Sequence, residues 1–268
     1  LRSDPAAALT ATAAEPDVAG LIVFNFITMS FDNTSLSNQA FLGKLALLHT
    51  HLQGIFMNIA LIGASGFIGS ALRNEALTRQ HQVTAIVSNP GKLSPQAGLS
   101  IAKVDVNDTA ALATQLKGFD AVLSAFSGHA QANTQDYYLA GLRSIVAAVK
   151  QAGVPRLLVV GGTGSLEVAP GVQLLDTPQF PAMYKPTAEG ARQALTLLRA
   201  EPTLNWTMLS PSAVIAPGQR TGKFRLGADQ LLTNAAGESH ISVEDYAVAM
   251  LDELERPAHA RQRFTAGY

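Results

Sequence analysis

Three glycines spaced three residues apart, directly after a short apolar run, constrain this chain more than any other feature. The apolar run covers residues 58–62, and the seven residues that follow read Gly63-Ala64-Ser65-Gly66-Phe67-Ile68-Gly69. Apolar side chains then recur at helical spacing over residues 67–78, so a strand, a tight turn and a helix follow one another. The first glycine permits the turn, the second lets a ligand approach the backbone, and the third lets the helix pack on the strand.

Such a turn favours an anion, because free backbone N–H groups and the positive end of the helix dipole point at the same place. The pyrophosphate of a dinucleotide is therefore the ligand we expect. The alternative is a strand-to-helix turn that binds nothing, which glycine spacing alone does not exclude. The agreement of strand, turn, helix and following strand favours the dinucleotide. Its predicted contacts in the turn are Gly63, Ser65, Gly66, Phe67, Ile68 and Gly69.

Strand and helix patterns alternate along the rest of the chain. Strands are expected at residues 58–62, 82–87, 100–104, 121–125, 156–160 and 206–209, and helices at 67–78, 109–116, 137–151 and 187–200, with a last helix capped by Ser242. Near-continuous apolar strands are buried on both faces, which is typical of parallel sheets covered by helices on both sides. We predict a doubly wound α/β fold of the Rossmann type, formed as a single domain with its ligand site at the carboxyl ends of the strands.

The first 56 residues differ from the rest of the chain. They begin with Leu, are rich in Ala, Thr, Ser and Asn, and carry few charges. We interpret Met57 as the natural start of the folded domain, which spans residues 57–268 and includes a small substrate-side region at its C-terminal end. Residues 1–56 are then either upstream sequence outside the natural protein or an extension that packs on the domain or on a partner.

Composition argues against several classes of function. The 268 residues include 19 Lys and Arg against 20 Asp and Glu, so the chain lacks the excess positive charge that is typical of nucleic-acid binding. No apolar run reaches the roughly 18 residues of a membrane span. Without cysteine there is no thiol nucleophile, disulfide or cysteine-bound metal, and no metal-ligating cluster of His and carboxylates is recognisable. These features fit a cytoplasmic protein that binds neither nucleic acid nor a membrane, and they specify no oligomeric state.

The glycine spacing, with Phe67-Ile68 before the last glycine, resembles that of extended and atypical members of the short-chain dehydrogenase/reductase superfamily. Four segments are similar to bacterial NAD(P)H-binding, NmrA-like proteins and to the group called NADH-flavin reductases: residues 57–69, 83–90, 157–166 and 241–246. The third reads Leu157-Leu158-Val159-Val160-Gly161-Gly162-Thr163-Gly164-Ser165-Leu166. The likeness covers residues 57–268 and implies a nicotinamide dinucleotide as the cofactor.

The choice between NAD and NADP is made at the end of the second strand. NAD-binding relatives place an acid there for the ribose diol, but this chain has no Asp or Glu between Glu75 and Asp105. NADP-binding relatives often place an Arg there, where this chain has Ser88 and Asn89, with Lys92 nearby. These three side chains can donate to a 2′-phosphate and nothing repels it, so NADP is favoured over NAD. A solvated turn that begins at Asn89 is the alternative.

Two further segments follow strands at places where the resemblance implies cofactor contacts. Asp105-Val106 would meet the adenine, although Asp105 could equally be a helix cap or a turn acid. Ala125-Phe126-Ser127 would border the ribose and the nicotinamide, where small residues permit close approach.

The usual proton donor of the superfamily is missing. Its reductases use a Tyr with a Lys four residues later, because this spacing puts both on one helix face and lets the ammonium lower the pKa of the phenol. No Tyr of this chain has such a Lys, and the neighbours Tyr184 and Lys185 point about 100° apart on a helix. The catalytic candidates are Ser165, at the place of the substrate-orienting Ser, and Tyr184, in a proline-rich loop over residues 167–186. A turn hydroxyl for Ser165 and a packing aromatic for Tyr184 are the alternatives.

The expected function is an NAD(P)H-dependent oxidoreductase that transfers hydride to a flavin, a quinone or a similar small acceptor. Such acceptors suit the missing Tyr–Lys pair, because a flavin can draw its proton from water. The alternative is a non-catalytic NAD(P)-binding redox sensor or regulatory protein, which the missing pair also fits. A sugar-nucleotide epimerase or dehydratase is the third candidate, and the missing pair argues against it.

Overall fold

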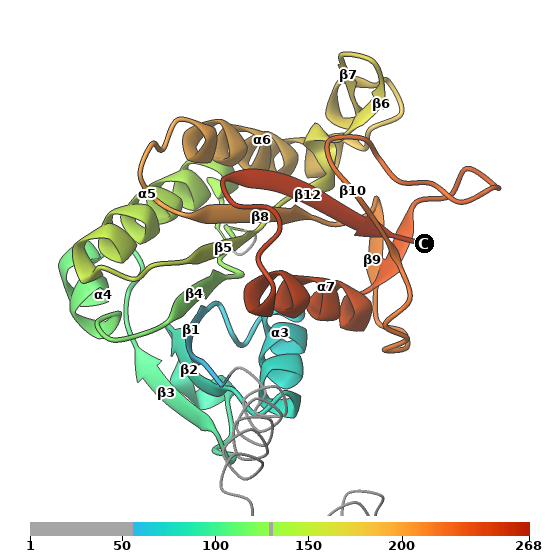
Figure 1. Cartoon of the computed structure of the whole chain (residues 1–268). Coiled ribbons are helices and arrows are strands. Elements are labelled where there is room, and N and C mark those ends of the chain that lie inside the picture. Colours follow the sequence, from blue (N-terminus) through green and yellow to red (C-terminus); the bar gives the residue numbers. More distant parts are fainter. Residues whose placement is uncertain (1–55, 129–130) are drawn as a thin grey trace, which may run out of the picture. The chain divides into compact units, whose positions relative to one another are not determined.

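The computed structural model describes residues 56–128 and 131–268, and Figure 1 shows the path of the chain. The chain divides into two compact units, and all of the described residues lie in the second, Gly54–Tyr268. Residues 1–55 and 129–130 lie outside the described part, so the expectation for the segment 1–56 stays a prediction.

The described unit is built on an eight-stranded sheet. Its strands are β1 (Asn58–Ile62), β2 (Gln82–Val87), β3 (Leu99–Lys103), β4 (Ala121–Ser124), β5 (Leu157–Val160), β8 (Trp206–Ser210), β10 (Arg225–Gly227) and β12 (Gln262–Gly267). Their order across the sheet is β10-β12-β8-β5-β4-β1-β2-β3, and every neighbouring pair is parallel except β10 with β12. The strand order reverses direction between β1 and β4, as in a doubly wound sheet. The predicted Rossmann-type fold is confirmed.

Helices cover both faces of the sheet. On one face lie α3 (Phe67–Thr78) and α7 (Val243–Glu255); on the other lie α4 (Thr109–Gln115), α5 (Thr134–Ala152) and α6 (Lys185–Arg199) (Figure 1). The side chains of β1 alternate between two cores, since Ile59 and Leu61 pack with α3 and α7 while Ala60 and Ile62 pack with the other three helices. Both faces of the strand are buried, and this is why it reads as a continuous apolar run.

The sequence patterns do not predict β12, the strand that extends the sheet beyond β8. Its polar residues Arg263 and Thr265 interrupt the apolar signal, yet both side chains are buried. The hydroxyl of Thr265 donates to the backbone carbonyl of Ser210 at 2.8 Å. Burial of β12 therefore depends on hydrogen-bond partners from distant parts of the chain.

Residues 167–184 of the predicted loop form no α-helix, as expected, whereas Lys185 and Pro186 at its end belong to α6. Instead, β6 (Glu167–Ala169) pairs with β7 (Val172–Gln173), and short 3-10 turns follow. Helix α6 then begins two residues earlier than predicted, with Pro186 in its first turn. A proline is tolerated there because the first N–H groups of a helix have no partner within the helix. A second small sheet pairs β9 (Val214–Ala216) with β11 (His240–Ser242).

Among the helices of residues 56–128 and 131–268, none combines the length and the apolar character that a membrane span requires. Within those ranges, no group of three or more His, Asp or Glu side chains is placed to hold a metal ion. The cytoplasmic location stays a prediction.

Candidate functional site

The first glycine of the turn brings the ends of two strands together at the point where the strand order reverses. Gly63 adopts a φ of +80°, in the left-handed region, and its N–H donates to the carbonyl of Ile86 at 3.1 Å. A β-carbon at this position would lie 2.6 Å from the carbonyl oxygen of Ala125, which follows β4. Only glycine therefore fits here. In an open α/β sheet this switch point, at the carboxyl ends of the strands, is the place where ligands bind.

The other two glycines of the turn have opposite surroundings. A β-carbon on Gly69 would lie 2.0 Å from the carbonyl oxygen of Gly63, so this glycine lets α3 pack on the turn. A β-carbon on Gly66 would meet nothing closer than 3.4 Å, and Gly66 is exposed together with Ser65 and Phe67. Gly66 therefore faces open space, where a ligand can approach the backbone.

The N-terminus of α3 lacks a partner from the described residues. Its N-cap is Gly66, which has no side chain to accept a hydrogen bond, and the first turn contains no acidic residue. The first N–H groups of a helix have no acceptor within the helix. Together with the helix dipole, these groups suit a bound phosphate. The residues present therefore fit the pyrophosphate of a dinucleotide.

The chain forms an exposed turn at the end of β2, as the alternative to a phosphate contact there predicted. Ser88, Asn89 and Lys92 are exposed, and the side-chain oxygen of Asn89 accepts a hydrogen bond from the N–H of Gly91 at 3.1 Å. This bond uses the acceptor of Asn89 and leaves its amide N–H groups to donate. The turn is thus compatible with the proposed phosphate contact, and that contact stays a prediction.

The two residues expected near the adenine differ in exposure. Asp105 is exposed and accepts a hydrogen bond from the N–H of Asn107 at 2.9 Å, as a turn acid does. The side chain of Val106 is buried in the core beneath α5, and the hydroxyl of Ser144 donates to its carbonyl. Any contact of Val106 with a cofactor would therefore involve its backbone.

The segment after β4 borders the glycine turn. The N–H of Ala125 donates to the carbonyl of Ile62 at 2.9 Å, and Ser127 is exposed. The ring of Phe126 packs on α5, with its centroid 5.5 Å from that of Tyr137. A β-carbon on Gly141 of α5 would lie 2.2 Å from this ring, so the small residue makes room for it. Phe126 thus anchors the segment, while Ala125 is partly buried and Ser127 is exposed.

Ser165 is buried and already has a partner. Its hydroxyl oxygen accepts a hydrogen bond from Nη1 of Arg263 at 3.0 Å, and Nε of Arg263 donates to the carboxylate of Asp229 at 2.8 Å. Burial lowers the pKa of the Arg263 guanidinium, and the hydrogen bond to Asp229 only partly offsets this. Ser165 keeps its own proton to donate, but its orientation is set by Arg263. Sequence reasoning missed Arg263, which lies on the unpredicted strand β12, and Asp229, which is 34 residues away from it in the sequence.

Tyr184 is half exposed and stands at the N-terminus of α6, next to the strongly exposed Met183. A side chain that is 54% exposed does little to pack its loop onto the domain, so the packing alternative for Tyr184 is weakened. The ring is accessible to a small molecule. Lys185 is the first residue of α6 and directly follows Tyr184, so the pair does not reproduce the stacked arrangement of the superfamily.

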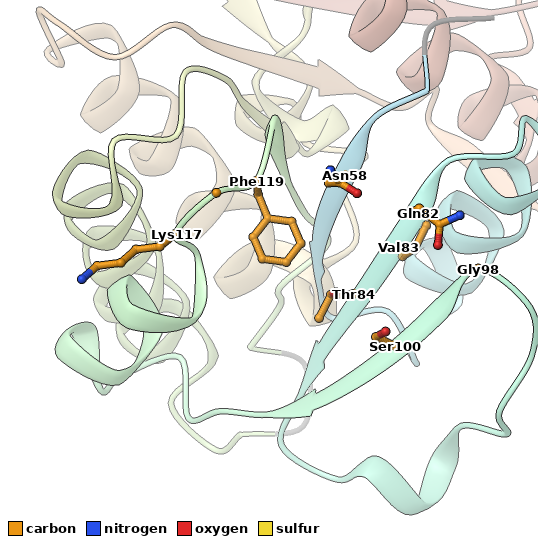
Figure 2. A pocket seen from close by; sticks show the side chains of 9 residues that line it. Asn58, Gln82, Val83, Thr84, Gly98, Ser100, Lys117 and Phe119 are labelled. Carbon is orange, nitrogen blue, oxygen red and sulfur yellow. The ribbon is translucent and has the colours of Figure 1, made fainter.

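A shallow hollow of about 310 Å³ lies at the opposite end of the sheet, where β1, β2 and β3 begin (Figure 2). It is lined mainly by polar side chains, among them Asn58, Gln82, Thr84 and Ser100, together with Phe119. Ligands of doubly wound sheets bind at the carboxyl ends of the strands. This hollow is at the amino ends, so we do not assign it to the dinucleotide.

Comparison with known proteins agrees with the geometry of the glycine turn. Residues 63–257 match the family described as NAD(P)H-binding. The chain belongs to this NAD(P)H-binding family, and its resemblance to atypical short-chain dehydrogenase/reductase proteins is confirmed.

Individual relatives cover most of the described residues. The uncharacterized protein YwnB of Bacillus subtilis is 45% identical over 212 residues, which are 78% of this chain and 97% of that protein. The solved structure of a candidate epimerase from Bacteroides thetaiotaomicron is 45% identical, with a TM-score of 0.74, over 80% of this chain and 97% of its own. That of a candidate NADH-flavin reductase from Streptococcus pneumoniae is 38% identical, with a TM-score of 0.68, over 79% of this chain and 99% of its own.

Proposed function

We propose that this protein is an NAD(P)H-dependent oxidoreductase that transfers hydride to a flavin, a quinone or another small, flat acceptor. The observation that carries the proposal is the open N-terminus of α3 beside Gly66, at the carboxyl ends of β1 and β4. Membership of the NAD(P)H-binding family and the name of the Streptococcus pneumoniae relative support it.

The residues of the chain would hold the cofactor mainly through backbone atoms. The N–H groups that open α3 would bind the pyrophosphate, and the segment Ala125-Phe126-Ser127 would border the nicotinamide ribose. When bound, the nicotinamide supplies a hydride, which is two electrons and one proton. The protein's contribution is to position the ring and the acceptor and to exclude competing orientations.

The nature of the acceptor follows from the side chains near α6. Ser165 is bound by Arg263, and Tyr184 has no lysine stacked on the same helix face to assist proton transfer. A carbonyl substrate would need such an acid, because its oxygen must gain a proton as the hydride arrives. A flavin or quinone that receives the hydride can take its second proton from water. The missing acid therefore favours these acceptors.

The missing acid also favours the alternative, a non-catalytic NAD(P)-binding sensor that binds a partner according to its redox state. The Bacteroides thetaiotaomicron relative is named as a candidate epimerase, but epimerases of this superfamily rely on the Tyr–Lys pair that this chain lacks. Turnover with a redox acceptor separates the enzyme from the sensor.

The test is calorimetric titration of the full chain with NADPH and NADH, followed by turnover assays with FMN, FAD and a panel of quinones. Binding with turnover supports the reductase. Binding without turnover, together with a partner protein retained by only one redox form, supports the sensor. A matched Gly66→Glu variant places a carboxylate at the mouth of the turn and should abolish binding. No binding by the parent protein would refute both functions.

A further inference from the structure

We infer that Arg73, on α3, is the residue that recognises the 2′-phosphate of NADP in this protein. The inference rests on the proposed function and deepens it, because it assigns the cofactor preference to one side chain. The inference supplies an arginine for the phosphate although the end of β2, where NADP-binding relatives often have one, carries Ser88 in this chain.

The side chain of Arg73 runs back along α3 toward the glycine turn. Its Nη1 donates to the carbonyl of Ala64 at 3.4 Å, and its Nη2 donates to the side-chain oxygen of Asn74 at 3.1 Å. This direction is the normal one, since side chains on a helix tilt toward its N-terminus. The guanidinium therefore lies beside the turn that we assign to the pyrophosphate, although Arg73 itself is two helical turns away.

The turn carbonyl that holds Arg73 lies next to the end of β2. Strands β1 and β2 are parallel neighbours with Ile62 opposite Ile86, and the N–H of Gly63 donates to the carbonyl of Ile86. Ala64 and Ser88 each come two residues after this pair. In this fold the adenosine ribose is read at the end of the second strand. A phosphate on its 2′-oxygen would thus have the Arg73 guanidinium on one side and Ser88 on the other.

Arg73 faces away from the ion pairs of Arg79, the C-cap residue of α3. Arg79 pairs with Glu75 at 2.7 Å and with Asp252 and Glu255 of α7 at 2.8 and 2.9 Å. Residues two apart on a helix point about 160° away from each other, so Arg73 lies on the side of α3 opposite Glu75. It therefore projects from the side of the helix turned away from α7.

The charge of Arg73 is free to bind an anion. Within residues 56–128 and 131–268, Arg73 forms no ion pair, and its buried Nε has no hydrogen-bond partner. No Asp or Glu occurs between Glu75 and Asp105 to compete for it. The planar fork of an arginine matches a phosphate group, whose charge would pair with the guanidinium. Arg73 is thus the described cation best placed to distinguish NADP from NAD.

The experiment measures binding, so it does not depend on turnover. Adenosine 2′,5′-bisphosphate, ADP, NADPH and NADH are titrated into the parent protein and into the variants Arg73→Gln and Arg73→Lys. Arg143→Gln is the matched control, because Arg143 is exposed on α5 and its loss changes the net charge equally. Circular dichroism checks the fold of each variant, and the lysine variant tests the inference if the glutamine variant fails to fold.

We expect Arg73→Gln to weaken binding of NADPH and the bisphosphate by about 10-fold or more, and to change NADH and ADP by less than about 2-fold. Arg73→Lys should weaken NADPH binding less, because the ammonium is a point charge without the fork geometry. The preference of the parent protein for NADPH should also shrink with added salt, whereas that of Arg73→Gln should not.

Three results would overturn the inference. Equal weakening of NADPH and NADH would mean that Arg73 only supports the glycine turn. Unchanged binding of all four ligands would place the phosphate elsewhere, while the proposed cofactor site itself would stand. No binding by the parent protein would refute the proposed function, and the inference with it.

Discussion

Helices α3 and α7 lie side by side on the same face of the sheet, but their N-termini are completed in opposite ways (Figure 1). Ser242 caps α7 by accepting the N–H of Asp245 at 3.0 Å, and Glu244 and Asp245 add negative charge to its first turn. Helix α3 has Gly66 as its N-cap, and it has neither a capping side chain nor an acid in its first turn. The comparison indicates that α7 is stabilised by its own residues and that α3 keeps its N–H groups for a ligand.

Of the two acids in the first turn of α7, Asp245 has a further structural role. Asp245 is fully buried and accepts hydrogen bonds from the backbone N–H groups of Thr221 and Gly222, both at 2.8 Å, and from the hydroxyl of Tyr268 at 2.7 Å. Burial by itself raises the pKa of Asp245, but these bonds outweigh it and hold the pKa below its usual value. Asp245 thus fixes the loop before β10 and the C-terminal residue to α7.

The largest effect should come from Asp245→Asn. This change removes the charge that four donors surround, because the hydroxyl of Thr221 also donates to Asp245. We expect a loss of about 3 kcal/mol in the free energy of unfolding at pH 7. Because the native pKa is depressed, the carboxylate stabilises the fold above its unfolded pKa of about 4, and this stabilisation fades as the pH falls through the native value. Urea unfolding at pH 7 and at pH 3 should show the difference between variant and parent shrinking at the lower pH. A constant difference would contradict this account.

Gly66→Asp should give α3 an N-terminus that is capped by a side chain, as that of α7 is. The new carboxylate can cap the helix, and the backbone of Gly66 is extended, so unfolding stability should change by no more than about 0.5 kcal/mol. The same carboxylate would occupy and repel the phosphate position, and we expect NADPH binding to weaken by about 100-fold or more. Calorimetry and thermal unfolding on the same sample measure both effects. Retained binding would show that the N-terminus of α3 is not the phosphate site.

Ser242→Ala is the matched change on α7. Loss of the cap should lower the unfolding stability by about 1 kcal/mol, because the N–H of Asp245 loses its acceptor. Cofactor binding should stay within about 2-fold of the parent, since α7 offers no site to a phosphate. A loss of NADPH affinity as large as that of Gly66→Asp would remove the contrast between the two helices.

Tyr184→Phe should have the smallest effect. The half-exposed ring keeps its shape without the hydroxyl, so stability and cofactor binding should not change measurably. If the acceptor takes its proton from water, turnover should fall by less than about 3-fold. A fall of about 100-fold or more, measured with the best acceptor of the panel, would make Tyr184 a general acid.

The glycine turn and the doubly wound sheet could be predicted because their signals are local. The positive φ of Gly63 and the close approach of Gly69 to the carbonyl of Gly63 are requirements within one strand, turn and helix, and a strand buried on both faces must be apolar along its length. The cap of α7 by Ser242 is equally local and was predicted correctly. The boundaries of α5 and α6 were less accurate, because the ends of a helix depend on packing as well as on sequence.

The sequence by itself determined the fold, the position of the glycine turn and the absence of the Tyr–Lys pair, because these depend on residues close together in the chain. Only the tertiary structure decided which polar side chains have hydrogen-bond or ion-pair partners and which can bind a ligand. Ser165 and Arg263 are 98 residues apart, yet one donates to the other. Arg73 looks like any surface arginine of a helix until its guanidinium is found at the carbonyl of Ala64. Periodicity reports which face of an element is buried, but partners distant in sequence are chosen by the way the elements pack.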